Sequence, residues 1–472
     1  MKLNKVDVRN YRCFASVSLS LHPQMTVIVA ENGQGKSTLL DAIRVGLWPF
    51  ISSFDLAKAS GYSDPQNGIA VADVRRVMES SVGMKRQLPT IIEVEADWGE
   101  LCSVECSNTM PASHWLRFRE SEASRTKTRG DGDTKQLEKW AKALQETVRK
   151  PEDASPLPVF GYYGTGRLWM QKRLLSEADR RSEKQSEKDD FYVRTFAYRH
   201  CMDPASSFKY FRDWFIWAWK SRTNTNERKS ATSADRIRAH ERIEAVQHAI
   251  DAILKPTTGW HTLEYSLEDG ETLILNHDNA GYLSVDQLSD GIRSVLAMVG
   301  DLAYRCIRLN PHLGSEAPSK TTGVVLIDEV DMHLHPRWQQ RILQALQTSF
   351  PSIQFVVTTH SPQVITTVAR ENLRVIHEED GQFDVVMPDF SPLGHSSGDA
   401  LSYVMGVTPT PAIDNIEELV AQTEQLIRAG KEQTPEAQQA MQTLTAMGYE
   451  FTEAELHTWR FLADLKKSRN DG

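Results

Sequence analysis

The sequence predicts an α/β protein whose core is a parallel sheet with helices on both faces. Two short apolar runs, Val324–Ile327 and Gln354–Thr358, are separated by a helical stretch at Pro336–Ser349. Continuous apolar strands that alternate with helices are typical of such a sheet. A third, β-branched run at Thr26–Val29 comes directly before a segment with helical apolar spacing, which begins at Ser37. These three runs therefore predict strands of the core.

The rest of the chain predicts an antiparallel β lobe and two helical regions. The opening residues, MKLNKVDVRNYR, alternate in polarity and predict a first strand rather than a signal peptide. The runs at 90–98 and 113–118 look like strands of the antiparallel lobe, and strands return at 262–276. We expect four parts in this order: a first lobe at 1–169, a helical insert at 170–258, a second lobe at 259–410 and a helical tail at 411–472.

Some segments leave two interpretations open. Residues 117–133 read as a polar, basic loop that either touches phosphates or is a solvated surface. The aromatic cluster at 208–219 has helical spacing, which favours a core or an interface over base stacking. The tail carries apolar stripes that are buried either against each other or against a partner. Residues 380–410 have only a weak pattern.

Composition excludes several classes of protein. The chain has 472 residues, of which 40% are hydrophobic and 25% charged, and its net charge is −9. It is therefore neither disordered nor fibrous. No apolar run approaches the roughly 18 residues of a membrane-spanning helix. The acidic balance argues against coating of nucleic acid by the whole surface, although a local basic groove stays possible.

The cysteines point to a reducing, cytoplasmic setting. There are five of them, they are scattered, and the odd number does not suggest a disulfide framework. Cys102 and Cys106 have the spacing of half a metal site, but no second Cys/His pair stands at ligand spacing. A structural role for both is the favoured interpretation.

The segment Ala30–Thr38, with the sequence AENGQGKST, has the features of a phosphate-binding loop. It follows a strand and opens a helix, so its backbone N–H groups and the helix dipole favour a bound anion. Lys36 is expected to bridge the β- and γ-phosphates of ATP, and Ser37 to hold Mg²⁺. A glycine-rich turn without a ligand is the alternative. Ala30 departs from the usual glycine, which matters only if that position needs a positive φ.

Two further strands end in residues suited to hydrolysis. Val324–Ile327 leads into Asp328 and Glu329. We expect Asp328 to reach Mg²⁺ through water and Glu329 to act as general base. The run FVVTTHSP places His360 after the next strand, where it would sense the γ-phosphate; alone, such a histidine is more often structural.

A fourth motif, LSDGIRS, lies between the phosphate loop and the Asp-Glu strand. Ser289 and the N–H of Gly291 are expected at a helix start, where a second anion can dock. The same residues also form a common helix N-cap, so the motif alone is feeble. Its position in the chain order favours the functional interpretation.

Together the four motifs resemble the ABC-type ATPase heads of the SMC, RecF and double-strand-break-repair families. The resemblance covers about 1–49 and 280–370. It implies a homo-oligomer in which two heads, head to head, sandwich two ATP molecules, because the signature motif of one chain completes the site of the other. The implied site residues are Asn32, Gly33, Gly35, Lys36, Ser37, Thr38, Ser289 and Gly291 for ATP, Ser37 and Asp328 for Mg²⁺, and Glu329, His360 and Lys36 for hydrolysis.

A closer resemblance is to the bacterial ATPases of the PtuA group, found in Septu and some retron anti-phage systems. It rests on PVFGYYGTGR at 158–167, the aromatic insert, LSDGIRS, and the two strand-end motifs. In that group the ATPase is encoded beside an HNH nuclease, which is therefore an expected partner. DNA, or a retron reverse transcriptase with its non-coding RNA, is a further candidate.

The sequence departs from the wider superfamily in three ways. It has no sustained heptads for a coiled-coil arm, no certain Q-loop glutamine (Gln171 is the nearest candidate) and no evident nuclease. We therefore expect an ATPase with slow turnover that regulates a separate nuclease. A RecF-like DNA repair or recombination ATPase is the alternative, and a transporter ATPase is disfavoured.

Overall fold

The computed structural model describes residues 1–57, 67–79, 83–103, 110–150, 154–168, 193–204, 208–408 and 416–470. These residues form two compact units, Met1–Met405 and Gly406–Gly472. Gln171 and the mixed-charge stretch at 172–190 lie outside the described residues. No helix in the described ranges is long and apolar enough to cross a bilayer.

A six-stranded sheet forms the core of the first unit, in the order β16-β15-β3-β14-β13-β9. All neighbouring pairs are parallel except β15 with β16. Its central strands are buried along their whole length, which explains their unbroken apolar character. The strands are β3 (Met25–Val29), β9 (Val159–Tyr163), β13 (Gly323–Ile327), β14 (Ile353–Thr359), β15 (Leu373–Glu379) and β16 (Gln382–Val386).

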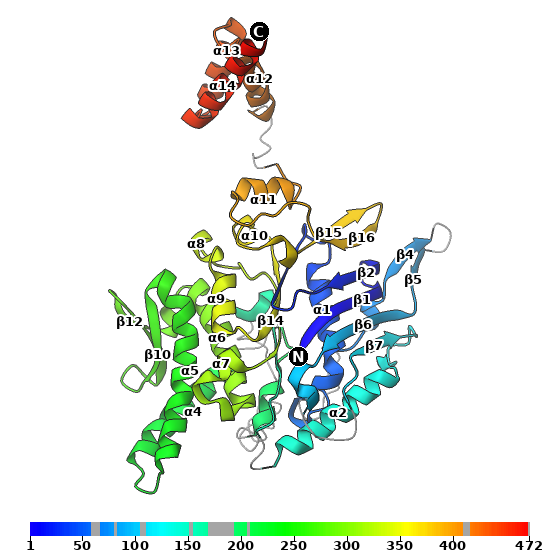
Figure 1. Ribbon diagram of the computed structural model, residues 1–472, viewed down its shortest axis with the longest axis vertical. Helices are drawn as coiled ribbons and strands as arrows, with labels where there is room; N and C mark the ends of the chain where they lie inside the picture. The colour runs from blue at the N-terminus through cyan, green and yellow to red at the C-terminus, as the bar shows by residue number, and fades with distance from the viewer. Residues whose placement is uncertain are drawn as a thin grey trace. The chain divides into compact units, whose positions relative to one another are not determined.

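A second, antiparallel sheet is the lobe expected from the sequence, in the order β2-β1-β6-β7-β8. Helix α1 (Lys36–Ile51) contacts strands of both sheets and so packs between them (Figure 1). Helix α2 (Gly132–Val148) packs on β7. The strands are β1 (Lys2–Tyr11), β2 (Phe14–Ser20), β6 (Thr90–Asp97), β7 (His114–Arg119) and β8 (Arg129–Gly130), with a separate hairpin of β4 (Arg76–Glu79) and β5 (Gly83–Arg86).

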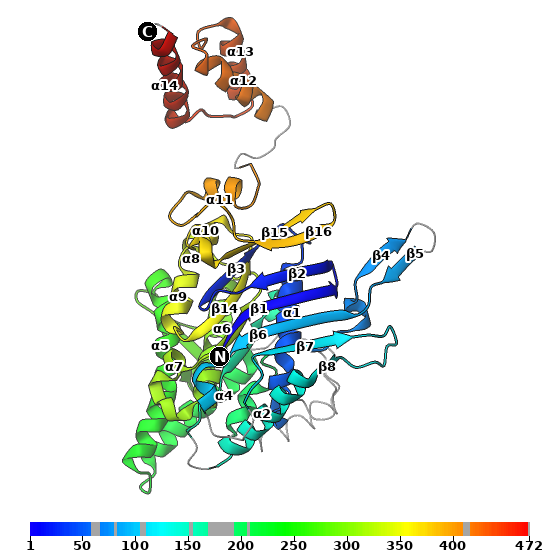
Figure 2. The same cartoon turned by 45° about the vertical axis from the view of Figure 1, so that its right-hand side comes forward.

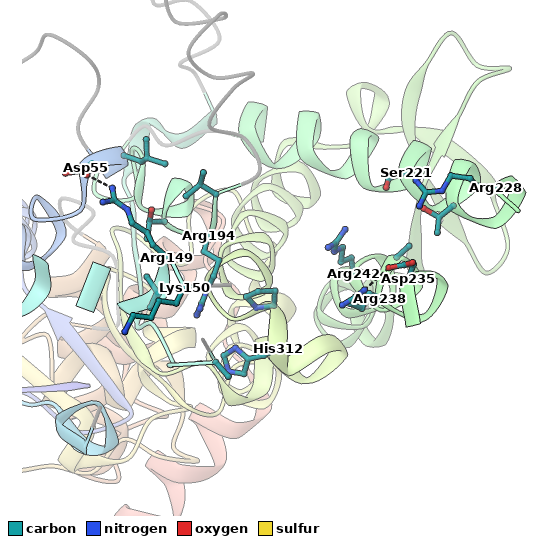
Figure 3. A pocket seen from close by; sticks show the side chains of 18 residues that line it. Asp55, Arg149, Lys150, Arg194, Ser221, Arg228, Asp235, Arg238, Arg242 and His312 are labelled. Carbon is teal, nitrogen blue, oxygen red and sulfur yellow. Dashed lines mark hydrogen bonds and ion pairs between the residues drawn. The ribbon is translucent and has the colours of Figure 1, made fainter. Parts of the chain in front are cut away.

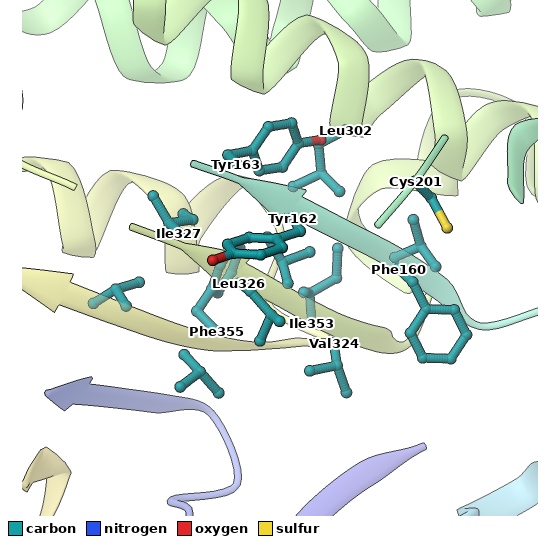
Figure 4. Packing of buried hydrophobic residues seen from close by; sticks show 14 of the residues in the cluster. Phe160, Tyr162, Tyr163, Cys201, Leu302, Val324, Leu326, Ile327, Ile353 and Phe355 are labelled. Carbon is teal, nitrogen blue, oxygen red and sulfur yellow. The ribbon is translucent and has the colours of Figure 1, made fainter. Parts of the chain in front are cut away.

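Helices cover the other face of the core sheet, as Figure 2 also shows. Helix α6 (Asp290–Leu309) contacts β9, and α4 (Phe208–Glu227) and α5 (Ser233–Thr258) pack on α6. Figure 4 shows Leu302 of α6 beside Tyr163 of β9. A small sheet completes this side, made of β10 (Trp260–Ser266), β11 (Thr272–His277) and β12 (Gly281–Ser284). The observed architecture confirms the predicted α/β class with an antiparallel lobe.

The aromatic cluster of α4 belongs to the core. Phe211, Trp214 and Phe215 are fully buried, and the ring centroids of Trp214 and Tyr304 are 5.1 Å apart. A Cβ on Gly300 would lie 2.5 Å from the ring of Phe211, so this glycine allows α4 to approach α6 closely. The core interpretation of these described aromatics is therefore confirmed.

Three sequence expectations need correction. The helix expected at 336–349 is broken into α8 (Pro336–Gln339) and α9 (Ile342–Ser349). The weakly patterned 380–410 contains the end of the β15–β16 hairpin and α11 (Ser397–Tyr403), and α10 (Pro362–Ile365) precedes it. The supposed loop at 117–133 contains the end of β7, strand β8 and the start of α2.

Arg117 and Arg119 within that segment are buried, with exposed fractions of 8% and 3%. Both lie on the inward face of β7, and their guanidinium groups donate hydrogen bonds to backbone carbonyls, including Val45 O at 3.1 Å and Ile69 O at 3.0 Å. The guanidinium groups of these two residues therefore have hydrogen-bond acceptors inside the protein. They are not available for the phosphate contact that the loop interpretation allowed.

The second unit contains three helices in its described part: α12 (Ile416–Arg428), α13 (Pro435–Ala446) and α14 (Glu453–Asn470). Its buried side chains include Ile427 and Leu444, and Arg460 pairs with Glu432 at 2.6 Å. The helices contact one another, α12 touching both α13 and α14. The apolar stripes of the tail are thus at least partly buried by self-packing.

Candidate functional site

Three neighbouring strands end at the same edge of the core sheet. β3, β14 and β13 are parallel and adjacent, with Thr359 opposite Val29 and Ile327 opposite Val357. The residues that follow these strands therefore meet at one edge. The phosphate loop, the Asp328–Glu329 pair and His360 are brought together in this way, as expected from the sequence.

The glycines of the loop after β3 have conformations that other residues rarely adopt. Gly33 has φ 86° and Gly35 has φ 96°. A Cβ on Gly35 would also lie 2.5 Å from Cζ of Phe14 and 2.8 Å from Sγ of Cys13. Ala30 does not have a positive φ, so the alanine at this position introduces no strain. The loop geometry is therefore compatible with this departure from the usual motif.

Lys36 begins α1 and lies almost entirely buried inside the loop. Its Nζ donates hydrogen bonds of 2.9 Å to both Ala30 O and Glu31 O. Burial lowers the pKa of Lys36, while the nearby carboxylates of the site act in the opposite direction. The ammonium group is thus held at the centre of the loop, where an incoming phosphate would replace carbonyl oxygens as its partner.

Asp328 is buried and fixed by hydroxyl groups on both carboxylate oxygens. Ser37 Oγ donates to Oδ2 at 2.7 Å, and Thr358 Oγ1 donates to Oδ1 at 2.6 Å. The hydroxyl of Ser37 and this carboxylate are hard oxygen ligands of the kind Mg²⁺ prefers. No group of three or more His, Cys, Asp or Glu in the described ranges is arranged for a metal.

Glu329 adopts a left-handed backbone conformation, with φ 48°. Its N–H donates to Thr358 Oγ1 at 2.8 Å, so one threonine hydroxyl contacts both residues of the Asp-Glu pair. A non-glycine residue in this region costs about 1–3 kcal/mol and persists only where its surroundings impose it. The strain turns the chain sharply after Asp328, and Glu329 remains half-buried beside the site.

His360 is half-buried at the end of β14. Its pKa is lowered from the usual value chiefly by burial and then by the positive charge of Lys36, while Glu329, Asp331 and Asp328 act to raise it. These electrostatic interactions place His360 among the candidate residues. The imidazole is neutral at pH 7, so its ring can donate one hydrogen bond and accept another.

Sequence reasoning did not assign a role to several residues that connect these motifs. Thr359 Oγ1 donates to Asp331 Oδ1 at 2.5 Å, and Ser361 Oγ donates to Gln339 Oε1 at 2.8 Å. Gln339 in turn donates to Leu334 O at 3.0 Å. The segments after β13 and β14 are therefore tied together. The Thr-Thr pair at the end of an otherwise apolar strand was the signal available in the sequence.

Ser289 and Gly291 lie at the start of α6, as expected. Ser289 is the exposed N-cap, and its side chain makes no capping hydrogen bond. A Cβ on Gly291 would lie 2.5 Å from His333 O, so the glycine lets α6 pack on the backbone that follows β13. In the part of the chain that the structure describes, no hydrogen bond joins either residue to the loop at 30–38.

A buried network joins α6 to the Asp-Glu strand. Tyr163 OH donates to Asp301 Oδ2 at 2.9 Å, and Arg305 Nε donates to the same oxygen at 2.7 Å. The backbone oxygen of Tyr163 accepts from the N–H of Asp328 at 2.8 Å. One residue of β9 therefore contacts both the helix that carries Ser289 and the residue that faces Ser37.

The fold and this site define a phosphate-loop ATPase domain. A family model described as "AAA domain, putative AbiEii toxin, Type IV TA system" matches residues 25–366, and a second one, "AAA ATPase domain", matches residues 1–48. The first match spans all four motifs and most of the chain. The protein belongs to this AAA-domain family.

Individual similar proteins describe the relationship in more detail than the family models do. The chain is 27% identical to the "Retron Vc95 probable ATPase" of Vibrio cholerae, over 92% of this chain and 84% of that protein. It is 35% identical to the "Septu protein PtuA" of Bacillus mycoides, over 21% of this chain and 13% of that protein. Among solved structures it is similar to an SMC head bound to the C-terminal winged-helix domain of ScpA, with 14% identity, a TM-score of 0.45, and coverage of 82% and 98% of the two chains.

Proposed function

We propose that the chain is the ATPase of an anti-phage defence system and that it assembles with, and regulates, a separate HNH-type nuclease. The observation that carries the proposal is the similarity to a retron probable ATPase along 92% of the chain. The local similarity to a Septu protein supports the same kind of system. Because the match covers 92% of the chain, the likeness extends beyond the common ATPase motifs.

The proposed reaction is hydrolysis of ATP to ADP and phosphate. The loop amides and Lys36 bind the phosphates, Ser37 and Asp328 hold Mg²⁺, and Glu329 accepts a proton from the attacking water. When bound, Mg²⁺ neutralises charge on the phosphate oxygens. His360 donates a hydrogen bond to the γ-phosphate in this proposal. The burial of Asp328 and its two hydrogen bonds from Ser37 and Thr358 support a fixed, ligand-holding role, and the half-buried position of Glu329 supports a role toward water.

We further propose that the working unit is a dimer in which Ser289 and Gly291 contact the nucleotide of the partner. The side chain of Ser289 is exposed and makes no capping hydrogen bond to its own helix, which supports this arrangement. Ser289→Arg should leave ATP binding by one chain within about twofold, yet abolish ATP-dependent dimers in light scattering, because a bulky side chain blocks close approach of the partner's phosphates. Dimers of the variant at wild-type concentration would contradict the arrangement.

Where a reading frame for an HNH nuclease adjoins that of this chain, co-expression of the two proteins tests the nuclease partnership. The proposal expects a complex on size exclusion and nuclease activity that changes with ATP. A retron reverse transcriptase with its RNA is added in a second arm as a further candidate partner. Failure to recover any complex, together with tight binding of duplex DNA ends by the ATPase alone, would favour a RecF-like repair role instead.

A further inference from the structure

A cavity of about 950 Å³ lies in the first unit, and none of its lining residues belongs to the nucleotide site. Its walls come from the end of α2, the 3-10 helix η7 (Arg194–Tyr198), the α4–α5 hairpin and the 3-10 helix η9 (Pro311–Glu316). Figure 3 shows its labelled side chains in two groups, those of the α4–α5 hairpin facing those of the other segments. We call it the basic cavity.

The lining of the basic cavity is strongly positive. It includes two acidic residues, Asp55 and Asp235, and six that are always cationic: Arg149, Lys150, Arg194, Arg228, Arg238 and Arg242. The cavity therefore carries an excess of positive charge in a chain whose net charge is −9. Such local concentration against the overall balance is the electrostatic signature of a site for an anionic partner.

The two carboxylates already have partners within the structure. Asp55 pairs with Arg149 at 2.5 Å and also accepts from Gln145. Asp235 pairs with Arg238 at 2.7 Å and caps the start of α5 through Thr232. Neither acid can therefore neutralise the cations on the opposite wall. Lys150 and Arg228, both exposed, come from these two walls.

Of the remaining cations, Arg194 is held by hydrogen bonds to the backbone oxygens of Leu309 and Ser155, which leaves Lys150, Arg228 and Arg242 to meet a ligand. Arg242 is half-buried and stacks on the ring of Trp217, with its Cζ 5.6 Å from the ring centroid. Its pKa is lowered chiefly by burial and further by the like charge of Arg238. Positive groups that repel one another in a partly desolvated cavity are stabilised by an anion placed between them.

The side chains of the lining also indicate which part of an anionic ligand they contact. Among the described residues that line the basic cavity there is no Phe, Tyr or Trp. Hydroxyl groups of Thr195, Ser221 and Thr225 accompany the cations. Arginine, lysine and hydroxyl side chains are the usual contacts to phosphate oxygens.

We propose that the basic cavity binds the phosphate backbone of a single-stranded nucleic acid, without regard to sequence. The cations stand on two facing walls and come from three chain segments, namely the residues after α2, the 3-10 helix η7 and the α4–α5 hairpin, which suits a series of separate phosphodiesters. A free nucleotide carries its phosphates at one end and would engage one wall only. A rigid duplex cannot bend into a cavity of this size, whereas a single strand can. The inference goes beyond the proposed ATPase and nuclease functions and does not depend on them.

The test compares two double charge reversals. Lys150→Glu with Arg228→Glu alters one exposed cation on each wall. Lys229→Glu with Arg236→Glu is the matched control: both residues are exposed, lie on or beside the same hairpin and do not line the cavity. Thermal melting and ATP affinity verify that both proteins are folded.

The probes are fluorescent oligo-dT and oligo-dA of about 20 nucleotides, longer than the roughly 4–16 nucleotides that one nucleic-acid-binding domain usually covers. Unlabelled duplex and inorganic triphosphate serve as competitors. Anisotropy over a salt series should show equal affinity for both strands in the wild type. The cavity variant should bind about tenfold more weakly, and the slope of log K against log salt should fall by about 1.4 for two lost phosphate contacts.

The control variant should change affinity less than about threefold, since its lost charges act only at long range. Equal losses in both variants would overturn the proposal, because general charge would then explain binding. So would a duplex that competes as well as the single strand. Displacement of the strand by triphosphate at equal phosphate concentration would assign the cavity to a free nucleotide and overturn the proposal as well.

Discussion

The nucleotide site and the basic cavity both present cations to phosphate, but they balance charge differently. At the nucleotide site a single buried lysine, Lys36, interacts with Asp328, Glu329 and Asp331. In the basic cavity six cations accompany two acids, and the two acids pair with only two of the six, Arg149 and Arg238. In the nucleotide site the charge of one fixed lysine is balanced by nearby carboxylates. In the basic cavity the positive charge exceeds the negative charge.

Because of this difference, we expect the two sites to respond differently to their ligands and to salt. A loop that binds through backbone N–H groups depends on shape, so its affinity is governed by conformation. A set of exposed arginines depends on release of counterions, so its affinity falls steeply as salt rises. ATP binding should therefore be much less sensitive to salt than strand binding in the same protein.

The largest effect is expected from Lys36→Ala. Loss of the buried ammonium removes the charged contact to the phosphates, and ATP affinity should fall at least about 100-fold, or about 2.7 kcal/mol. Calorimetric titration with ATP measures this. Lys320→Ala, at an exposed lysine paired with Glu316, is the matched control and should leave affinity unchanged. Normal ATP affinity in Lys36→Ala would refute the assignment of the phosphate loop.

Glu329→Gln should have the next largest effect, on turnover rather than on binding. The amide keeps the size of the side chain but cannot accept the proton, so the hydrolysis rate should fall about 100-fold or more while ATP affinity changes less than twofold. Phosphate release and light scattering together measure the rate and the accumulated dimer. Glu268→Gln, at an exposed glutamate, is the control. Unchanged turnover would show that Glu329 is not the base.

A smaller effect is expected from protonation of His360. Its pKa is lowered in the free protein by burial and by Lys36, so at any pH the ring is less protonated than that of an ordinary histidine. A bound triphosphate adds negative charge and raises this pKa, so ATP binding should take up protons near pH 6 and fewer at pH 8. Titration in two buffers of different ionisation heat measures the uptake.

The same linkage has a consequence for the stability of the free protein. Between the lowered folded pKa and the ordinary value of His360, the unfolded chain binds more protons, so the contribution of this residue falls as pH drops below about 6.5. His360→Asn should remove both this dependence and the proton uptake. Uptake that persists in the variant would assign it to another group.

The smallest effect should come from Tyr163→Phe, which lies outside both sites. The change removes one hydrogen bond to the buried carboxylate of Asp301 and leaves the backbone contact to Asp328 intact. The free energy of unfolding should fall by about 1–2 kcal/mol in urea titrations. ATP and strand affinities should both stay within about twofold; a selective loss of either one would show that the hydroxyl positions that site.

Much of the core could be predicted because its strands are apolar throughout and its loops carry glycine. The positions of β3, β13 and β14 follow from burial on both faces. The strand β16 has an exposed, alternating pattern at a sheet edge, and so gave little signal. At the end of α8, just before the break to α9, Gln339 accepts a hydrogen bond from Ser361 Oγ, a long-range contact that no local pattern records.

The predictions from sequence were wrong for polar residues whose hydrogen-bond partners lie in the protein interior. Arg117 and Arg119 looked like a solvated basic loop, yet they are satisfied by backbone carbonyls from distant segments. The cations of the basic cavity could not be grouped from the sequence either, because they come from three separate segments between Arg149 and Arg242. Spatial convergence of this kind depends on the fold, not on spacing.

The buried network of Tyr163, Asp301 and Arg305 also constrains how this protein can diverge. Replacing Arg305 alone would leave Asp301 charged and unpaired in the interior, at a cost of about 3–5 kcal/mol. Replacing Tyr163, Asp301 and Arg305 together by apolar residues of similar volume would leave no buried charge and so would not incur this cost. Descendants of this chain should therefore exchange the pair together or keep both, and single intermediates should be rare in any lineage.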